Sequence, residues 1–185
     1  RGRLDIDGQV LVDSRRFVPA HRRRIGLLGQ QPLLFPHLDV LGNVAYGPRA
    51  QRLRRDEARA LALGMLERLD AADLASRRPG ELSGGQAARV ALARALATRP
   101  RAMLIDEPFA AVDVEYTPRL RVAVKAALAE VGCPCIIVTH DPADVAALAD
   151  DVAVLENGRI VEHGLAAEIM ASPGSSFGKL LFTQK

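Results

Sequence analysis

Polar and apolar residues alternate near both ends of the chain. In residues 1–13 the alternation surrounds an Asp-Gly pair, and in residues 152–164 it surrounds an Asn-Gly pair. Side chains of a strand point alternately to the two faces of a sheet, and such dipeptides suit tight turns. The pattern therefore predicts two short strands joined by a tight turn at the first site. At the second it predicts a hairpin with a type I′ turn at Asn157-Gly158.

Between these ends, apolar residues recur every three or four positions, the spacing that places side chains on one face of an α-helix. Three such stripes are present: Ala58, Leu61, Met65 and Leu69; Val90 and Leu92 to Leu96; Leu120, Val124, Leu128 and Val131. Gly132 suits the position after the third helix, and residues 142–150 predict a fourth, short helix. Residues 31–48 contain three prolines, so we expect at most short helices there, and residues 172–185 predict a loosely structured end.

Short continuous apolar runs predict three buried strands, within residues 24–30, 102–106 and 135–140. Runs of this kind are typical of strands inside parallel sheets. Strands that alternate with helices predict an α/β fold with a mainly parallel sheet.

Composition narrows the class of protein. The chain has 185 residues, 49% hydrophobic and 25% charged, as in a soluble globular domain. Its apolar runs fall far short of the ~20 residues of a membrane span, so we expect a cytosolic protein.

The net charge of +3 comes with arginine clusters at residues 21–26 and 51–59, which we interpret as solvated faces. Aromatic content of 4% argues against stacking on nucleic-acid bases, so no nucleic-acid partner is expected. Cys133 and Cys135 cannot build a zinc site by themselves and are interpreted as reduced thiols.

The sequence Met-Leu-Ile-Asp-Glu-Pro ends a predicted strand with two carboxylates, Asp106 and Glu107. Ligands gather at the carboxyl ends of strands in open α/β sheets. An acidic residue there can hold Mg²⁺, and its neighbour can deprotonate an attacking water. A solvated acidic turn fits the same pattern.

The sequence Leu-Ser-Gly-Gly-Gln, residues 82–86, precedes a predicted helix. Ser83 can cap that helix, while Gly84 and Gly85 allow backbone N–H groups to approach an anion at the positive end of the helix dipole. A plain Ser-capped helix is the simpler alternative. The position of this segment shortly before the acidic pair favours phosphate binding. Gln30, Asp113 and His140, each near a predicted strand end or turn, are weak signals singly.

Taken in order, these features resemble the ATP-binding subunit of an ABC transporter over nearly the whole chain. The corresponding motifs are Gln30 as the Q-loop, residues 82–86 as the signature, residues 103–107 as the Walker B strand, Asp113 as the D-loop and His140 as the switch histidine. The resemblance implies a P-loop NTPase-like ABC ATPase core with its first strands missing. It also implies a helical subdomain: residues 1–36 would be partial core, 37–97 helical subdomain, and 98–185 core.

The same resemblance implies ATP and Mg²⁺ as cofactors. Asp106 and Gln30 would contact the metal, Glu107 would activate water, and His140 and Gln30 would complete the catalytic set. The residues implied to contact ATP across a head-to-tail dimer are Ser83, Gly84, Gly85, Gln86 and Asp113. Two departures from the family pattern are Ala88, where a polar residue is frequent, and Ala110-Ala111-Val112 before Asp113, where Ser-Ala-Leu is usual.

A lysine-bearing phosphate loop, G-x-x-x-x-G-K-[ST], is absent from this sequence, whose lysines are Lys125, Lys179 and Lys185. In the family it precedes every motif described above. We therefore expect an N-terminally truncated fragment or a degenerate homologue, with the non-Met start favouring the fragment. We also expect that this polypeptide by itself does not hydrolyse ATP.

Residues 34–49 and 172–181 resemble importers of small oxyanions, molybdate especially. This resemblance implies transmembrane permease subunits and a second ATP-binding subunit as partners, on the cytoplasmic face of the cell membrane. Two alternatives remain: a non-catalytic ABC-type interaction module, and a non-transport ABC ATPase. The latter usually carries a coiled-coil insertion, yet the interval from Gln30 to Leu82 lacks sustained heptads.

Overall fold

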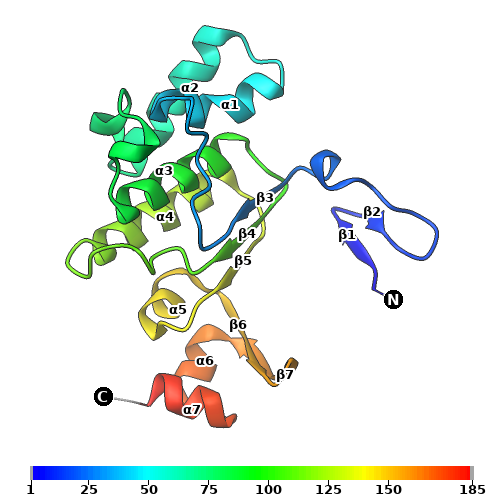
Figure 1. The fold of residues 1–185 in the computed structure, drawn as a ribbon. Helices are drawn as coiled ribbons and strands as arrows, with labels where there is room; N and C mark the ends of the chain where they lie inside the picture. Colours follow the sequence, from blue (N-terminus) through cyan, green and yellow to red (C-terminus); the bar gives the residue numbers. More distant parts are fainter. Residues whose placement is uncertain (1, 184–185) are drawn as a thin grey trace. The chain divides into compact units, whose positions relative to one another are not determined.

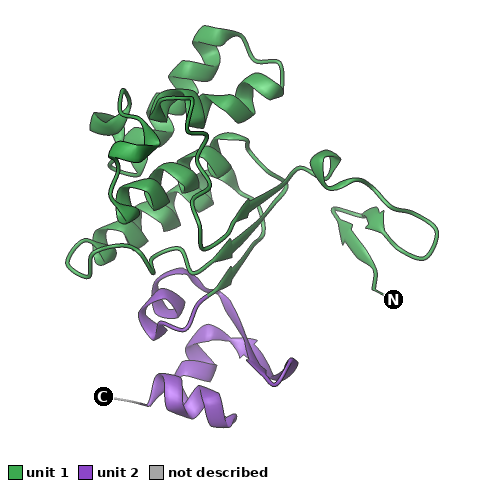
Figure 2. Ribbon diagram, viewed as in Figure 1, with its two compact units in different colours: residues 1–138 green, residues 139–185 purple. Residues whose placement is uncertain are grey.

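The computed structural model describes residues 2–183; Arg1, residue 184 and Lys185 lie outside the described part. The chain divides into two compact units, Arg1–Val138 and Thr139–Lys185 (Figure 2). The first unit contains β1 (Leu4–Ile6), β2 (Gln9–Val12), β3 (Ile25–Leu28), α1 (Val40–Ala50), α2 (Arg55–Arg68), α3 (Gly84–Ala97), β4 (Ala102–Asp106), α4 (Thr117–Val131) and β5 (Cys135–Val138). Its short 3-10 helices are η1 (Ala20–Arg22), η2 (Ala72–Leu74) and η3 (Pro79–Glu81). The second unit contains α5 (Pro142–Leu148), β6 (Asp151–Glu156), β7 (Arg159–Leu165), α6 (Ala166–Ala171) and α7 (Ser176–Phe182).

A parallel sheet of order β3–β4–β5 forms the centre of the first unit, which confirms the predicted α/β fold (Figure 1). Its two faces differ in burial. Gly26, Leu28, Met103 and Ile105 are buried, whereas Leu27, Leu104, Ile136 and Val138 are exposed. The continuous apolar runs predicted strands buried on both faces, and only one face is covered by residues that the structure describes.

Both predicted hairpin turns are present. β1 pairs antiparallel with β2, and β6 pairs antiparallel with β7. In the second hairpin Asn157 and Gly158 have φ of 49° and 74°. Positive φ at both central residues is the requirement of a type I′ turn, so this prediction is confirmed.

The prediction of at most short helices in residues 31–48 was wrong, because α1 extends for 11 residues. Asp39 caps it by accepting a hydrogen bond from the Gly42 N–H at 2.6 Å. Asn43 is fully buried, and its side chain bonds both backbone groups of Phe35. Pro48 lies inside α1, two residues before its end, and its missing N–H removes one hydrogen bond to the carbonyl four residues earlier.

The predicted loose end was also wrong in part, because residues 176–182 form α7. Ser175 caps this helix by accepting from the Gly178 N–H at 3.0 Å. Glu162 of β7 accepts hydrogen bonds from the Gly174 and Ser175 backbone N–H groups at 2.8 and 3.0 Å. The Ser175 hydroxyl, which donates to the same carboxylate at 2.6 Å, lowers the pKa of the Glu162 carboxyl most, and the two backbone bonds lower it further. Together these bonds hold the start of α7 against the hairpin.

The remaining helix predictions are confirmed in α2, α3, α4 and α5. α4 ends at Gly132 in the left-handed conformation, with φ of 65°. The helices α1, α2 and α3 pack on one another through fully buried side chains: Val40, Val44, Ala62, Leu66, Val90 and Leu96. Within residues 2–183, none of the helices combines the length and the apolar character that crossing a bilayer requires.

Candidate functional site

The acidic pair lies at the carboxyl end of the central strand, as predicted. Asp106 is the last residue of β4 and stands opposite Val138 of β5 in the parallel register. Glu107 follows with φ of 50°, and its N–H donates to the Val138 carbonyl at 2.9 Å. A left-handed backbone at a residue other than glycine costs about 1–3 kcal/mol. The strand pairing holds this conformation and turns the chain away from the sheet at Glu107.

A small cavity of about 20 Å³ lies between Gln30 and Glu107. Its other lining residues are Leu28, Gly29, Pro32, Ala88, Pro108 and Ala111. A volume of this size holds about one water molecule. The space for about one water is thus lined by the predicted Q-loop residue Gln30 and the predicted catalytic base Glu107. Ala88 of α3 and Ala111, from the segment before Asp113, complete its lining.

The signature segment forms the N-terminus of α3. Ser83 Oγ accepts from the Gln86 N–H at 3.3 Å, and Gln86 Oε1 accepts from the Ser83 N–H at 3.0 Å. This reciprocal capping box satisfies two backbone donors and fixes the direction in which α3 begins. The exposed Ser83 and Gly84 therefore stand at the positive end of a 14-residue helix, which favours an anion.

The second signature glycine lies tightly against the segment that precedes Asp113. A Cβ atom at Gly85 would lie 3.1 Å from the Ala111 carbonyl oxygen and 3.3 Å from Val112 Cα. At Gly84 the closest atom would be Ala111 Cβ at 3.6 Å, an ordinary contact. Gly85 therefore allows a close backbone approach that a side chain could keep only if the neighbouring backbone shifted by a few tenths of an ångström.

Asp113 itself is exposed and stabilises the turn into α4. Its Oδ1 accepts from the Glu115 N–H at 3.1 Å, and its carbonyl accepts from the Tyr116 and Thr117 N–H groups at 3.0 and 2.9 Å. The role of Asp113 in nucleotide binding stays a prediction.

His140 belongs to the second unit, between Thr139 and the N-cap of α5. Its flanking residues are fixed by two hydrogen bonds. Thr139 Oγ1 donates to Asp144 Oδ2 at 2.6 Å and accepts from the Asp141 N–H at 3.1 Å. The local backbone around His140 is therefore well defined, while its catalytic role stays a prediction.

Sequence reasoning missed Arg94 of α3, which contacts the segment after Gln30. Its guanidinium donates to the Leu33 and Pro32 carbonyl oxygens at 2.9 and 3.0 Å and lies 5.1 Å from the Phe35 ring centroid. Burial lowers the pKa of this guanidinium. Leu33 has φ of 43°, so these bonds also hold a strained backbone. No local sequence pattern predicts this contact, because it joins Arg94 to carbonyl groups 61 and 62 residues away in the chain.

Replacing Arg94 by lysine should loosen the segment from Gln30 to Phe35. A single ammonium cannot reach both carbonyl groups as the planar guanidinium does, and a hydrogen bond to a charged group contributes about 1.5–3 kcal/mol. We expect the free energy of unfolding to fall by about that amount in denaturant titration, with faster amide exchange in residues 30–35.

The exposed Arg59 on α2 provides a matched control, since Arg59→Lys changes the same side chain at a solvated position. If both variants unfolded at the same denaturant concentration as the wild type, the proposed importance of Arg94 would be contradicted.

The donors present fit Mg²⁺ only as an incomplete site. Asp106 and Gln30 offer a carboxylate and an amide oxygen, the hard donors that Mg²⁺ prefers. No group of three or more His, Cys, Asp or Glu among residues 2–183 could hold a metal ion. A magnesium ion here would thus rely on water and phosphate oxygens for its remaining ligands, as Mg²⁺ in nucleotide sites commonly does.

Comparison with known proteins identifies the family of this chain. The sequence profile of ABC transporters matches residues 1–110. This chain belongs to the ABC transporter family. Among ABC structures, a dimeric post-hydrolysis state of the ATP-binding cassette MJ0796 bound to ADP and Pi has a TM-score of 0.76 at 29% identity. That similarity covers 90% of this chain and 74% of the other.

Curated members of the ABC family with similar sequences are named for different transported substrates. The Fe(3+) ions import ATP-binding protein FbpC of Pseudomonas fluorescens is 48% identical over 94% of this chain and 48% of its own length. The molybdenum import ATP-binding protein ModC of Mycobacterium tuberculosis is 45% identical over 96% and 50%. The spermidine/putrescine import ATP-binding protein PotA of Acidothermus cellulolyticus is 41% identical over 95% and 45%. The chain spans about half the length of these relatives.

Proposed function

We propose that this chain is part of the ATP-binding subunit of an ABC importer, which binds ATP with Mg²⁺ and hydrolyses it. The observation that carries this proposal is the cavity for about one water between Gln30 and Glu107. A carboxylate beside one water is the arrangement that general-base attack on a phosphate needs.

Each residue of the site has a role in this proposal. Glu107 accepts the proton of the attacking water, and Gln30 orients that water. Asp106 and Gln30 hold Mg²⁺, which when bound neutralises charge on the phosphate oxygens. His140 donates a hydrogen bond to the transferred phosphoryl group.

The nucleotide at the signature face belongs to a second copy of the subunit. The exposed start of α3 supports this assignment, because its N–H groups and dipole favour a terminal phosphate. The residues proposed to face that ATP are Ser83, Gly84, Gly85, Gln86 and Asp113. This chain then supplies the water-activating and signature parts of the sites. Its 185 residues contain no lysine-bearing phosphate loop.

The membrane partner in this proposal is a permease that docks on residues 34–49, at the start of a helical subdomain of residues 37–97. Residues 1–36 and 98–185 are then the ATPase core. The protein would act peripherally, on the cytoplasmic face of the cell membrane. We propose molybdate or a related small oxyanion as the transported solute, supported by the similarity to ModC and by residues 172–181.

Hydrolysis is tested by phosphate release from Mg-ATP with the native protein purified from its source cells. We expect turnover that EDTA abolishes. A native protein that binds ATP without releasing phosphate would instead indicate the second candidate, the non-catalytic interaction module.

The solute is tested by uptake in source cells that carry Glu107→Gln. We expect growth to fail on limiting molybdate and to continue on limiting iron or polyamine. Loss of iron or polyamine uptake alone would contradict the oxyanion assignment while leaving the importer assignment intact.

A further inference from the structure

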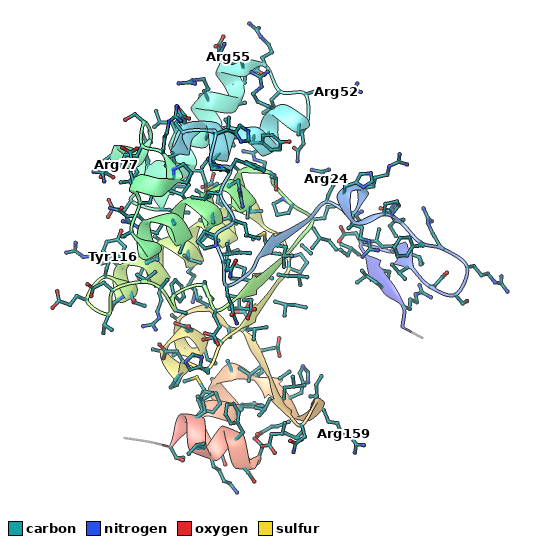
Figure 3. All side chains as sticks on the ribbon, in the orientation of Figure 1. Arg24, Arg52, Arg55, Arg77, Tyr116 and Arg159 are labelled. Atoms are coloured by element: carbon teal, nitrogen blue, oxygen red, sulfur yellow. The ribbon has the colours of Figure 1, made fainter. Side chains whose placement is uncertain are left out.

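Tyr116 lies at the turn that leads into α4 (Figure 3). Its side chain contacts two segments that are distant in sequence. Its hydroxyl donates to Asp70 Oδ2 at 2.5 Å, and Arg89 Nη1 donates to the same hydroxyl at 3.0 Å. Arg89 also donates to the Asp70 carbonyl oxygen and lies 4.6 Å from the Tyr116 ring centroid. Asp70 follows the end of α2, and Arg89 belongs to α3. One phenol at the start of α4 therefore contacts both the end of α2 and the signature helix.

These contacts differ in their expected strength. The Asp70 side chain is 77% exposed, and its carboxylate lies 3.8 Å from Arg89, so the ion pair itself contributes little. The Arg89 side chain is only 14% exposed. A largely buried cation is costly unless it is hydrogen-bonded. The tyrosine hydroxyl and ring, together with the Asp70 carbonyl oxygen, therefore hold Arg89. The pKa of Tyr116 is raised by burial and by its bond to Asp70.

A second contact joins the same stretch of chain to the same helix face. Gly85 and Arg89 are four residues apart on α3, so they lie on one side of it. Gly85 packs closely against the backbone of Ala111 and Val112, and Arg89 holds Tyr116. Residues 111–116 are thereby attached to α3 at both of their ends, with Asp113 between the two contacts.

We propose that Tyr116 is a positioning residue that fixes residues 111–116 onto the signature helix and the end of α2. The segment that carries Asp113 then stays fixed relative to the signature glycines of α3. Together, the segment and the glycines form one surface that faces the nucleotide. This inference rests on the proposed function, since the surface acts in turnover only if the native protein hydrolyses ATP.

The test replaces Tyr116 by phenylalanine in the native protein, which keeps the ring on Arg89 and removes both hydroxyl bonds. We expect amide exchange in residues 110–117 to become roughly fivefold faster, the effect of losing a net hydrogen bond. We expect kcat to fall by about the same factor and KM for ATP to stay nearly constant, because the contact acts on positioning rather than on nucleotide affinity. Tyr116→Ala, which also removes the ring, should give larger changes in both.

A double-mutant cycle distinguishes positioning from general loss of stability. Tyr116→Phe and Asp70→Ala both remove the hydrogen bond between Tyr116 and Asp70, so the double variant should lower kcat by less than the two single effects combined. Tyr46→Phe removes the other tyrosine hydroxyl and should leave exchange in residues 110–117 as in the wild type.

Unchanged exchange in residues 110–117 of the phenylalanine variant would overturn the proposal. So would faster exchange with an unchanged kcat. If the wild-type protein released no phosphate, the proposed function would fail, and the exchange result would still decide whether Tyr116 holds this segment.

Discussion

Replacing Glu107 by glutamine should reduce ATP turnover of the native protein by about 10²–10⁴-fold, the contribution of a positioned general base. The amide has the shape of the carboxylate but cannot accept the proton of the attacking water. The left-handed backbone at Glu107 is held by its bond to Val138, which the substitution keeps. Steady-state phosphate release at saturating Mg-ATP measures the effect.

ATP binding should persist in this variant, so a nucleotide-bound dimer should accumulate and elute earlier in size-exclusion chromatography. The exposed Glu67 on α2 provides the matched control, because Glu67→Gln makes the same change at a solvated position. Turnover of Glu107→Gln within tenfold of the wild type would refute the assignment of Glu107 as the base.

Replacing Gly85 by alanine should lower turnover about tenfold with little net change in stability. Alanine in place of glycine favours a helix by up to about 1 kcal/mol. Its Cβ, however, would lie 3.1 Å from the Ala111 carbonyl oxygen, which is tighter than ordinary contact and would displace the backbone before Asp113. The neighbouring backbone would have to shift by a few tenths of an ångström. A misplacement of about 1 Å can cost about 10²-fold in rate, so this smaller shift should cost about tenfold. Phosphate release and thermal unfolding of the same variant measure the two effects.

Gly84→Ala separates the steric effect from the loss of a glycine as such. Its Cβ would make only an ordinary contact with Ala111, at 3.6 Å. Amide exchange in residues 110–113 should therefore change in Gly85→Ala and stay constant in Gly84→Ala. Equal exchange in both variants would show that close packing at Gly85 does not position this segment.

The sequence predicted most elements because their patterns are local. Alternation around Asn157-Gly158 depends on the chain within a few residues, as does the Ser83 cap of α3. The prediction of an irregular segment at residues 31–48 was wrong because the contact that orders this segment is not local. Its prolines were visible in the sequence, whereas the buried Asn43 that fixes α1 to Phe35 acts through the fold.

The sequence by itself determined the α/β class, the order of the motifs and the residue types available for phosphate chemistry. Spacing along one chain is enough for these properties, because strands, caps and turns form from neighbouring residues. Only the tertiary structure decided that Gln30 and Glu107 share a cavity, that Arg94 holds the segment after Gln30, and that Tyr116 contacts Arg89 and Asp70. Each of these contacts joins residues from separate elements. Their meeting depends on how β3, β4 and the helices pack, which no local pattern encodes.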